Sequence, residues 1–231
     1  MEELWQGIIR ALQLIVALDT EVIQVARRSL LFAVTSCSIA TIICLPLGSI
    51  VHFNNFHGKR LFINITQTLY SVPTVAIGLF VFVFISNAGP LGELELLFTP
   101  AAIVIGQVLL VSPVITGLTI SALSGVDKSV TETAISLGAN NFQATVLVVR
   151  EARFAILAAL IMGFGRAISE VGLSLMVGGN IKGFTRTITT AISLETSKGE
   201  LELAIALGII LIFLSLMINI LLNRIQHRKE Q

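Results

Sequence analysis

Residues 96–126 read LLFTPAAIVIGQVLLVSPVITGLTISALSGV, and these 31 positions contain no Asp, Glu, Lys or Arg. A helix needs about 20 predominantly apolar residues to cross the roughly 30 Å hydrocarbon core of a bilayer. The run is too long for a barrel strand, and in lipid a helix pairs all of its backbone groups internally. The stretch therefore predicts a membrane-spanning helix near residues 100–123.

Comparable runs lie on both sides of this stretch. Three of them contain no charged residue at all: 29–58, 61–92 and 203–223. A fourth run, 154–181, is interrupted only by Arg166 and Glu170. The predicted spans lie near residues 29–51, 65–86, 100–123, 154–178 and 202–223. We therefore predict an all-α, polytopic membrane protein with about five transmembrane helices within residues 26–223.

The composition supports this class and excludes several others. Hydrophobic residues make up 55% of the 231 positions, and charged residues make up 13%, against about 25% in soluble domains. This excludes a soluble enzyme, a disordered chain and a disulfide scaffold. The net charge of +1 gives no electrostatic footprint for nucleic acid. The three His and two Cys are not spaced as metal ligands, so we expect no metal site.

Lys and Arg in the loops predict the orientation of the chain. The loops after the first, third and fifth spans, with the C-terminal tail, hold eight basic residues: Lys59, Arg60, Lys128, Arg150, Arg153, Arg224, Arg228 and Lys229. The loops after the second and fourth spans hold three: Lys182, Arg186 and Lys198. This places the 124–153 loop and the basic 224–231 tail in the cytoplasm and the N-terminus outside. Arg10, Arg27 and Arg28 then lie outside, against the rule, and a sixth, half-inserted N-terminal element is an alternative that would explain this.

The first 25 residues form an amphipathic segment. Its apolar residues recur at helical spacing: Leu4, Trp5, Ile8, Leu12, Ile15 and Val16. The opposite side carries Glu3, Arg10 and Gln13. We expect a helix that lies on the membrane surface or packs on neighbouring spans. The segment does not resemble a signal peptide, because acidic residues precede any basic one and no small-residue cleavage site follows.

The 124–153 loop is the longest polar segment between spans. Ser129 and Glu132 fit a capping box at the start of a helix of about two turns. Gly138 is placed to end that helix in the left-handed conformation, and Asn140 or Asn141 can cap a second helix. A preformed pair of helices favours a docking site for a partner. The alternative is a connector that is merely well capped.

The run 132–139, ETAISLGA, resembles the E-A-A-x-x-x-G signature of the integral-membrane permeases of ABC importers. Thr133 stands where the signature has its first Ala. In that family the loop is a coupling helix, which sits in a groove of the ATP-binding subunit. The resemblance implies this coupling role for Ser129, Glu132, Ala134, Gly138 and Ala139.

The chain contains no G-x-x-x-x-G-K-[ST] phosphate-binding loop. If transport is driven by ATP, we expect the ATPase to be a separate polypeptide, with ATP and Mg bound there. The chain is thus predicted to be a non-catalytic transmembrane subunit without a cofactor of its own.

The predicted fourth span contains a charged pair. Each charge inside a bilayer costs roughly 2.5–3.5 kcal/mol on insertion scales. Arg166 and Glu170 are four residues apart, so on one helix they can neutralise each other. With Ser169 they are candidates for a pathway or gate for an anion. The alternative is a structural ion pair that locks helices together.

The segment after this span is rich in hydroxyl groups, glycine and basic residues. Asn180, Thr185, Arg186 and Thr187 are candidates for hydrogen bonds to an oxyanion or to a binding protein. The alternative is a polar re-entry loop. Residues 165–200 resemble oxyanion permeases of the molybdate and tungstate type. Their end, TAISLETSKGE at 190–200, is most similar to the tungstate branch.

The resemblance implies a type I ABC importer permease in the cytoplasmic (inner) membrane, working as a homodimer among lipids. A periplasmic or extracellular solute-binding protein would deliver tungstate, and two ATP-binding subunits would power its import.

Molybdate, sulfate and phosphate are alternative substrates. An ion-coupled secondary transporter using Arg166 and Glu170 is a more distant alternative, though no internal repeat is visible. A membrane anchor of a redox enzyme would need paired His ligands within the spans, which the sequence lacks.

Overall fold

A computed structural model describes residues 2–17 and 19–227 of the chain, and its regular elements are all helices, as predicted. The N-terminal half contains α1 (Glu2–Val16), α2 (Thr20–Phe53), α3 (Lys59–Thr68), η1 (Leu69–Ser71), α4 (Thr74–Ile85), η2 (Gly92–Leu94) and α5 (Pro100–Ser124). The C-terminal half contains α6 (Lys128–Ser136), α7 (Asn141–Glu151), α8 (Arg153–Ile168), α9 (Gly172–Gly178), α10 (Ile188–Lys198) and α11 (Leu201–His227).

Three helices, α2, α5 and α11, are long and apolar enough to cross a membrane unbroken. Two further spans are bent: α3 with η1 meets α4 at 101°, and α8 meets α9 at 57°. Counting each bent pair as one span gives the predicted five. The predicted spans near 65–86 and 154–178 are therefore both present, and each is broken into two helices.

The break in the second span follows from Pro73. Proline has no backbone N–H and disfavours helical geometry in the residue before it. Val72 is accordingly extended, with ψ 130°, and Pro73 stands immediately before the first residue of α4. Pro46 and Pro113 lie within α2 and α5, which continue through them.

Helix α2 begins earlier than the predicted span, at Thr20 instead of residue 29. The carboxylate of Asp19 accepts a hydrogen bond of 3.0 Å from the backbone N–H of Val22 and so caps the helix. The charge-free run marks only the apolar part of this helix. Its first turns carry charged residues beyond that part.

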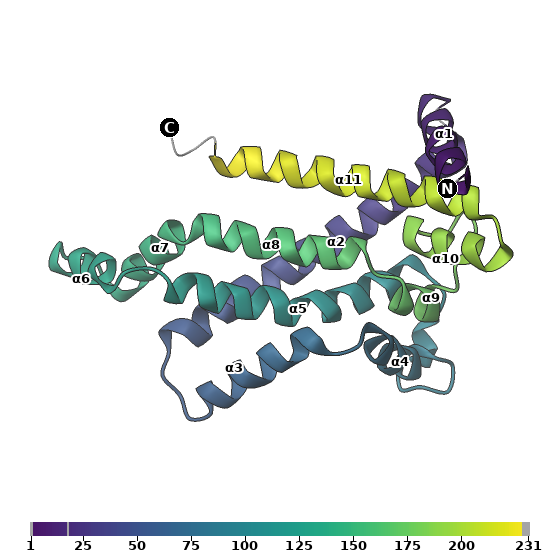
Figure 1. The fold of residues 1–231 in the computed structure, drawn as a ribbon. Helices are drawn as coiled ribbons and strands as arrows, with labels where there is room; N and C mark the ends of the chain where they lie inside the picture. Colours follow the sequence, from purple (N-terminus) through teal and green to yellow (C-terminus); the bar gives the residue numbers. More distant parts are fainter. Residues whose placement is uncertain (1, 18, 228–231) are drawn as a thin grey trace.

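The spans form a bundle around α5 (Figure 1). Helix α2 crosses behind α5 and α8, while α3 and α11 lie on opposite sides of this group. Helices α6 and α7 project from one end of the bundle. Helices α4, α9 and α10 gather at the other end, where α1 lies across the first turns of α11.

Small side chains allow the central helices to approach closely, as is usual in membrane bundles. The central core contains Ala33, Ala40, Cys44, Val111, Ile115, Ala167 and Ile168, from α2, α5 and the end of α8. Large apolar side chains on the outer faces of several spans are exposed: Leu31, Ile42, Ile50, Phe80, Val83, Ile212, Phe213 and Leu216. This arrangement suits a protein surrounded by lipid.

The N-terminal segment forms a helix, α1, as expected, but this helix ends at Val16, and residues 20–25 of the predicted segment belong to α2. Gly7 lies directly against the side chain of Ile205 on α11, and Leu14 joins a buried cluster with Val22 and Leu207. One face of α1 is therefore packed on neighbouring helices. At the other end of the chain, positions 228–231 of the predicted basic tail lie outside the described residues.

Candidate functional site

Helix α6 in the projecting loop begins with an Asp cap. The carboxylate of Asp127 accepts a hydrogen bond of 2.7 Å from the backbone N–H of Ser129, which lowers the pKa of this carboxyl from its usual value. The predicted capping box of Ser129 and Glu132 is wrong, because the helix begins at Lys128 and Ser129 is already inside it. A charged acceptor two residues earlier caps the helix in its place.

The end of α6 and the start of α7 agree with the prediction. Gly138 has φ +87°, and the backbone N–H of Ala139 reaches back to the carbonyl of Ala134 at 3.0 Å. This is the glycine-ended turn expected after a helix. Asn140 then caps α7 in a capping box with Gln143. The two helices are thus joined by a turn of defined geometry.

The coupling residues divide into an inner and an outer set. Ala134 is buried between the helices, whereas Ser129, Glu132 and Gly138 are exposed and Ala139 is half-buried. The loop also exposes large apolar side chains, which the sequence analysis missed. The three nearest Gly138 are Ile135, Leu137 and Phe142, with 51%, 83% and 76% exposed. The sequence did contain a signal for this exposure, because these apolar residues lie beside Gly138 in an otherwise polar loop. Exposed apolar side chains at a projecting tip are candidates for contact with another protein.

The broken span carries the second candidate site. Arg166 lies half-buried in the last turn of α8, and Ser169 is exposed just beyond the helix. Glu170 is 5% exposed and accepts a hydrogen bond of 2.8 Å from the backbone N–H of Leu173. It therefore stabilises the start of α9.

The predicted ion pair between Arg166 and Glu170 is not formed. In the part of the chain that the structure describes, ion pairs join Glu21 to Lys182 and Arg186, and Glu195 to Lys198. Because α8 ends at Ile168, the helical relation between positions four apart is lost before Glu170. The buried Nε of Arg166 has no hydrogen-bond partner among the described residues.

Side chains from other helices support the break. The side-chain amide of Gln107, on α5, donates to the carbonyl of Ala167 at 3.1 Å, and Ser36 donates to the Gln107 oxygen at 2.8 Å. Thr189, on α10, donates to the carbonyl of Glu170 at 2.8 Å. Backbone groups released by a broken membrane helix need such partners. Sequence reasoning missed Gln107, although it is the single amide side chain of an apolar span.

The exposed face at the end of α8 combines Met162, Gly165 and Ser169, with Arg166 beside it. The Ser169 hydroxyl bonds back to the carbonyl of Gly165 at 2.8 Å. A guanidinium group presents several N–H donors in a fork that suits oxyanions. This exposed face is therefore the strongest candidate for contact with an anion.

The segment between α9 and α10 uses most of its polar groups internally. Thr185 is buried and bonds the backbone of Gly178 and Ile181, and Thr187 caps α10. Arg186 lies 3.7 Å from Glu21, and Asn180 donates to the carbonyl of Thr190 at 3.2 Å. The four predicted residues thus share one segment, and their bonds hold it in place.

The bundle of broken and unbroken spans, with its projecting helical loop, is the architecture of a polytopic membrane protein. Residues 44–231 match the family described as binding-protein-dependent transport system inner membrane component. The chain belongs to this family and is a multi-pass protein of the inner membrane.

Full-length relatives support this assignment. The chain is 39% identical over 226 residues, 98% of its length and 99% of the relative's, to the tungstate uptake system permease protein TupB of Peptoclostridium acidaminophilum. It is 40% identical over 214 residues, 90% of its length and 92% of the relative's, to a probable anion ABC transporter permease protein of Haloferax volcanii. An inward-facing structure of the MetNI methionine ABC transporter shares the fold, with a TM-score of 0.74 at 16% identity, covering 92% and 97% of the two chains.

Proposed function

We propose that this chain is the membrane subunit of an ATP-driven importer of an oxyanion, and that its substrate is tungstate. The observation that carries the proposal is the full-length similarity, at 39% identity, to a permease named for tungstate uptake. The half-buried Arg166 beside the exposed end of α8 supports an anionic substrate. A single Arg attracts an oxyanion without the several contacts that would trap it.

The α6–α7 end of the bundle lies in the cytoplasm in this proposal, where an ATP-binding subunit carries ATP and Mg. Ile135, Leu137 and Phe142 supply apolar contact with that subunit, since all three are exposed beside Gly138. A solute-binding protein delivers the anion at the opposite end, and two copies of the chain enclose the path. The chain itself makes and breaks no covalent bond.

A short connection links the loop to the candidate path. Ala152 alone separates α7 from α8, and it packs with Leu123, Val148 and Ile156 in a buried cluster. Helix α8 runs from this cluster to Arg166. Movement of α6 and α7 by the ATP-binding subunits would therefore be transmitted directly to the end of α8.

Glu170 has a supporting role in this mechanism. Its side chain holds the first turn of α9, and its carbonyl is bound by Thr189 of α10. The segment of Asn180, Thr185, Arg186 and Thr187 continues this connection to α10. We propose that these residues position the outer gate, whereas Arg166 and Ser169 contact the anion.

The proposal is tested by purifying the tagged chain from its native membrane in mild detergent. ATPase activity is measured with periplasmic or extracellular extract loaded with tungstate, with molybdate or with neither. A co-purifying ATPase that tungstate-loaded extract stimulates is the expected result. An ATPase that responds only to another anion would contradict tungstate as the substrate. The absence of any co-purifying ATPase would contradict an ATP-driven importer.

A further inference from the structure

Helix α1 presents three distinct faces. Gly7 and Leu14 face the bundle, where Gly7 contacts Ile205 of α11. A polar stripe of Gln6, Arg10 and Gln13 lines an open pocket of about 500 Å³. Glu200 and Glu202 line the same pocket, next to the start of α11, together with Leu203 and with Ile9, which borders the polar stripe. The polar stripe therefore faces water.

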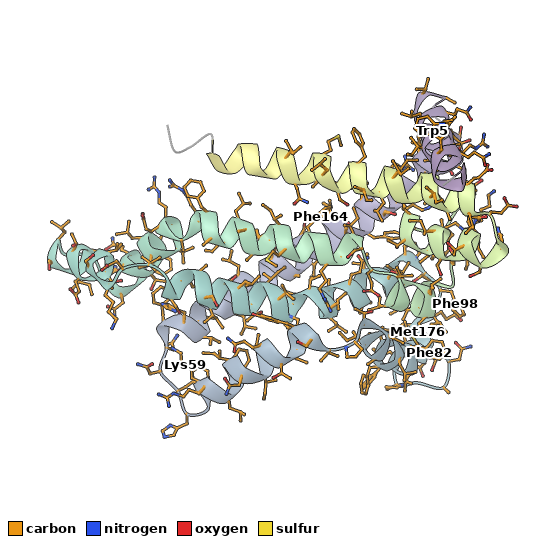
Figure 2. The ribbon with its side chains drawn as sticks, viewed as in Figure 1. Trp5, Lys59, Phe82, Phe98, Phe164 and Met176 are labelled. Atoms are coloured by element: carbon orange, nitrogen blue, oxygen red, sulfur yellow. The ribbon has the colours of Figure 1, made fainter. Side chains whose placement is uncertain are left out.

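The third face is apolar and uncovered. Trp5, Ile9, Leu12 and Val16 follow one another at intervals of four, three and four residues, which places them along one side of a helix. Their exposed fractions are 65%, 41%, 59% and 81%. Figure 2 shows Trp5 on α1 at the edge of the molecule. A stripe directed away from the bundle contributes nothing to its core.

The contact with α11 sets the depth of this stripe in the membrane. Glu200 and Glu202 are the last charged residues before the charge-free run that begins at Leu203. Gly7 packs on Ile205, within the first turns of that run. Helix α1 therefore crosses α11 where the polar turn gives way to the membrane span (Figure 1). A charged turn followed by a charge-free run is the pattern expected at the boundary between headgroups and acyl chains.

We propose that α1 is an interfacial anchor, with Trp5, Ile9, Leu12 and Val16 inserted into the outer-leaflet boundary of the lipid bilayer. Trp is enriched at this level, because its ring is apolar and its N–H can bond to headgroups. A helix with one charged or polar face and one apolar face binds in the plane of the interface. The opposite face of α1 then fastens the outer end of α11 at a fixed depth. This proposal is independent of the transported substrate.

Trp5 is the sole tryptophan of the chain, so its fluorescence reports on the stripe alone. The purified full chain is reconstituted into vesicles of phosphatidylcholine and phosphatidylglycerol. Some of the phosphatidylcholine is brominated either near the headgroup or near the bilayer centre. We expect blue-shifted emission that shallow bromines quench more strongly than deep bromines, with little quenching by aqueous iodide.

A matched pair of double variants tests the stripe itself. Leu12→Gln with Val16→Gln should shift Trp5 emission to longer wavelength and reduce quenching by lipid. Gln6→Ser with Gln13→Ser changes the polar stripe and should leave both readouts unchanged. A chain carrying Trp5→Phe and Leu137→Trp provides the reference for an aqueous site.

Two results would overturn the anchor. Quenching by iodide but not by brominated lipid would place Trp5 in water, open to a soluble partner. Quenching by neither agent would show that protein, such as a second copy of the chain, covers the stripe.

Discussion

Gln107 donates from its side-chain amide to the carbonyl of Ala167, where α8 is about to end. Ser36 completes the arrangement by donating to the Gln107 oxygen, so three helices meet at one buried amide. Gln107 is 3% exposed and has no access to water that would replace these bonds. At the scale of single residues, it is the side chain that ties the broken span to the rest of the bundle.

Replacing Gln107 by Leu keeps the approximate volume and removes both bonds. We expect a loss of stability of about 0.5–2 kcal/mol, the range for interhelical hydrogen bonds in membranes and for buried groups left unpaired. Thermal unfolding in detergent measures the effect. Gln67→Leu, at an exposed position of α3, is the matched control. Equal stability of the two variants would show that the amide does not support the break.

Arg166 has no carboxylate partner in the described residues, so its removal leaves no buried charge uncompensated. We therefore expect Arg166→Ala to insert and fold normally but to abolish tungstate uptake. Arg166→Lys keeps the charge and loses the planar fork of donors, so it should retain partial uptake. Uptake assays with equal amounts of membrane protein measure both variants. Normal uptake by Arg166→Ala would show that Arg166 does not contact the transported anion.

In helices α6 and α7, local sequence patterns predicted some of the helix ends but not the exposure of the side chains. Gly138 and Asn140 act through neighbours within a few residues, and both positions are as predicted. The start of α6 was mispredicted because two nearby residues compete as caps, and Asp127 prevails over Ser129. The exposure of Leu137 and Phe142 depends on how the helices pack on each other, which no local pattern contains.

The turn at Gly138 offers a test at the scale of the element. An L-residue in the left-handed conformation costs roughly 1–2 kcal/mol, so Gly138→Val should distort the α6–α7 connection. We expect normal insertion but reduced co-purification of the ATP-binding subunit and weaker stimulation of its activity. Gly183→Val places the same strain at φ +80°, at the other end of the bundle. Similar loss of the ATPase in both variants would contradict a specific role for this turn.

At the scale of the whole molecule, four charge-free runs and one run interrupted by Arg166 and Glu170 were enough to predict five spans and an all-helical fold. The bend of 101° lies at Pro73, a residue that disfavours a continuous helix. The bend of 57° was not predicted, since an apolar run continues through a break when side chains supply the missing hydrogen bonds. The partners at that break, Gln107 and Thr189, come from distant parts of the sequence. The same limit applies to Arg166 and Glu170, whose pairing was inferred from a continuous helix.

The predicted orientation can be tested with single cysteines. In a chain with Cys37→Ala and Cys44→Ala, Lys59→Cys should react with an impermeant thiol reagent only from the cytoplasmic side. Glu93→Cys should react only from the outside, because α3 and α4 together form one span between them. Labelling of intact cells and inverted vesicles distinguishes the sides. Reaction of both positions from the same side would contradict the five-span topology.

The central claim is that this chain conducts tungstate in an ATP-driven importer. The most direct measurement is uptake into proteoliposomes that contain the purified complex, with its binding protein outside and ATP inside. We predict ATP-dependent accumulation of tungstate in preference to molybdate and sulfate, lost in Arg166→Ala. Accumulation that needs no ATP, or that prefers another anion at equal concentration, would contradict the account.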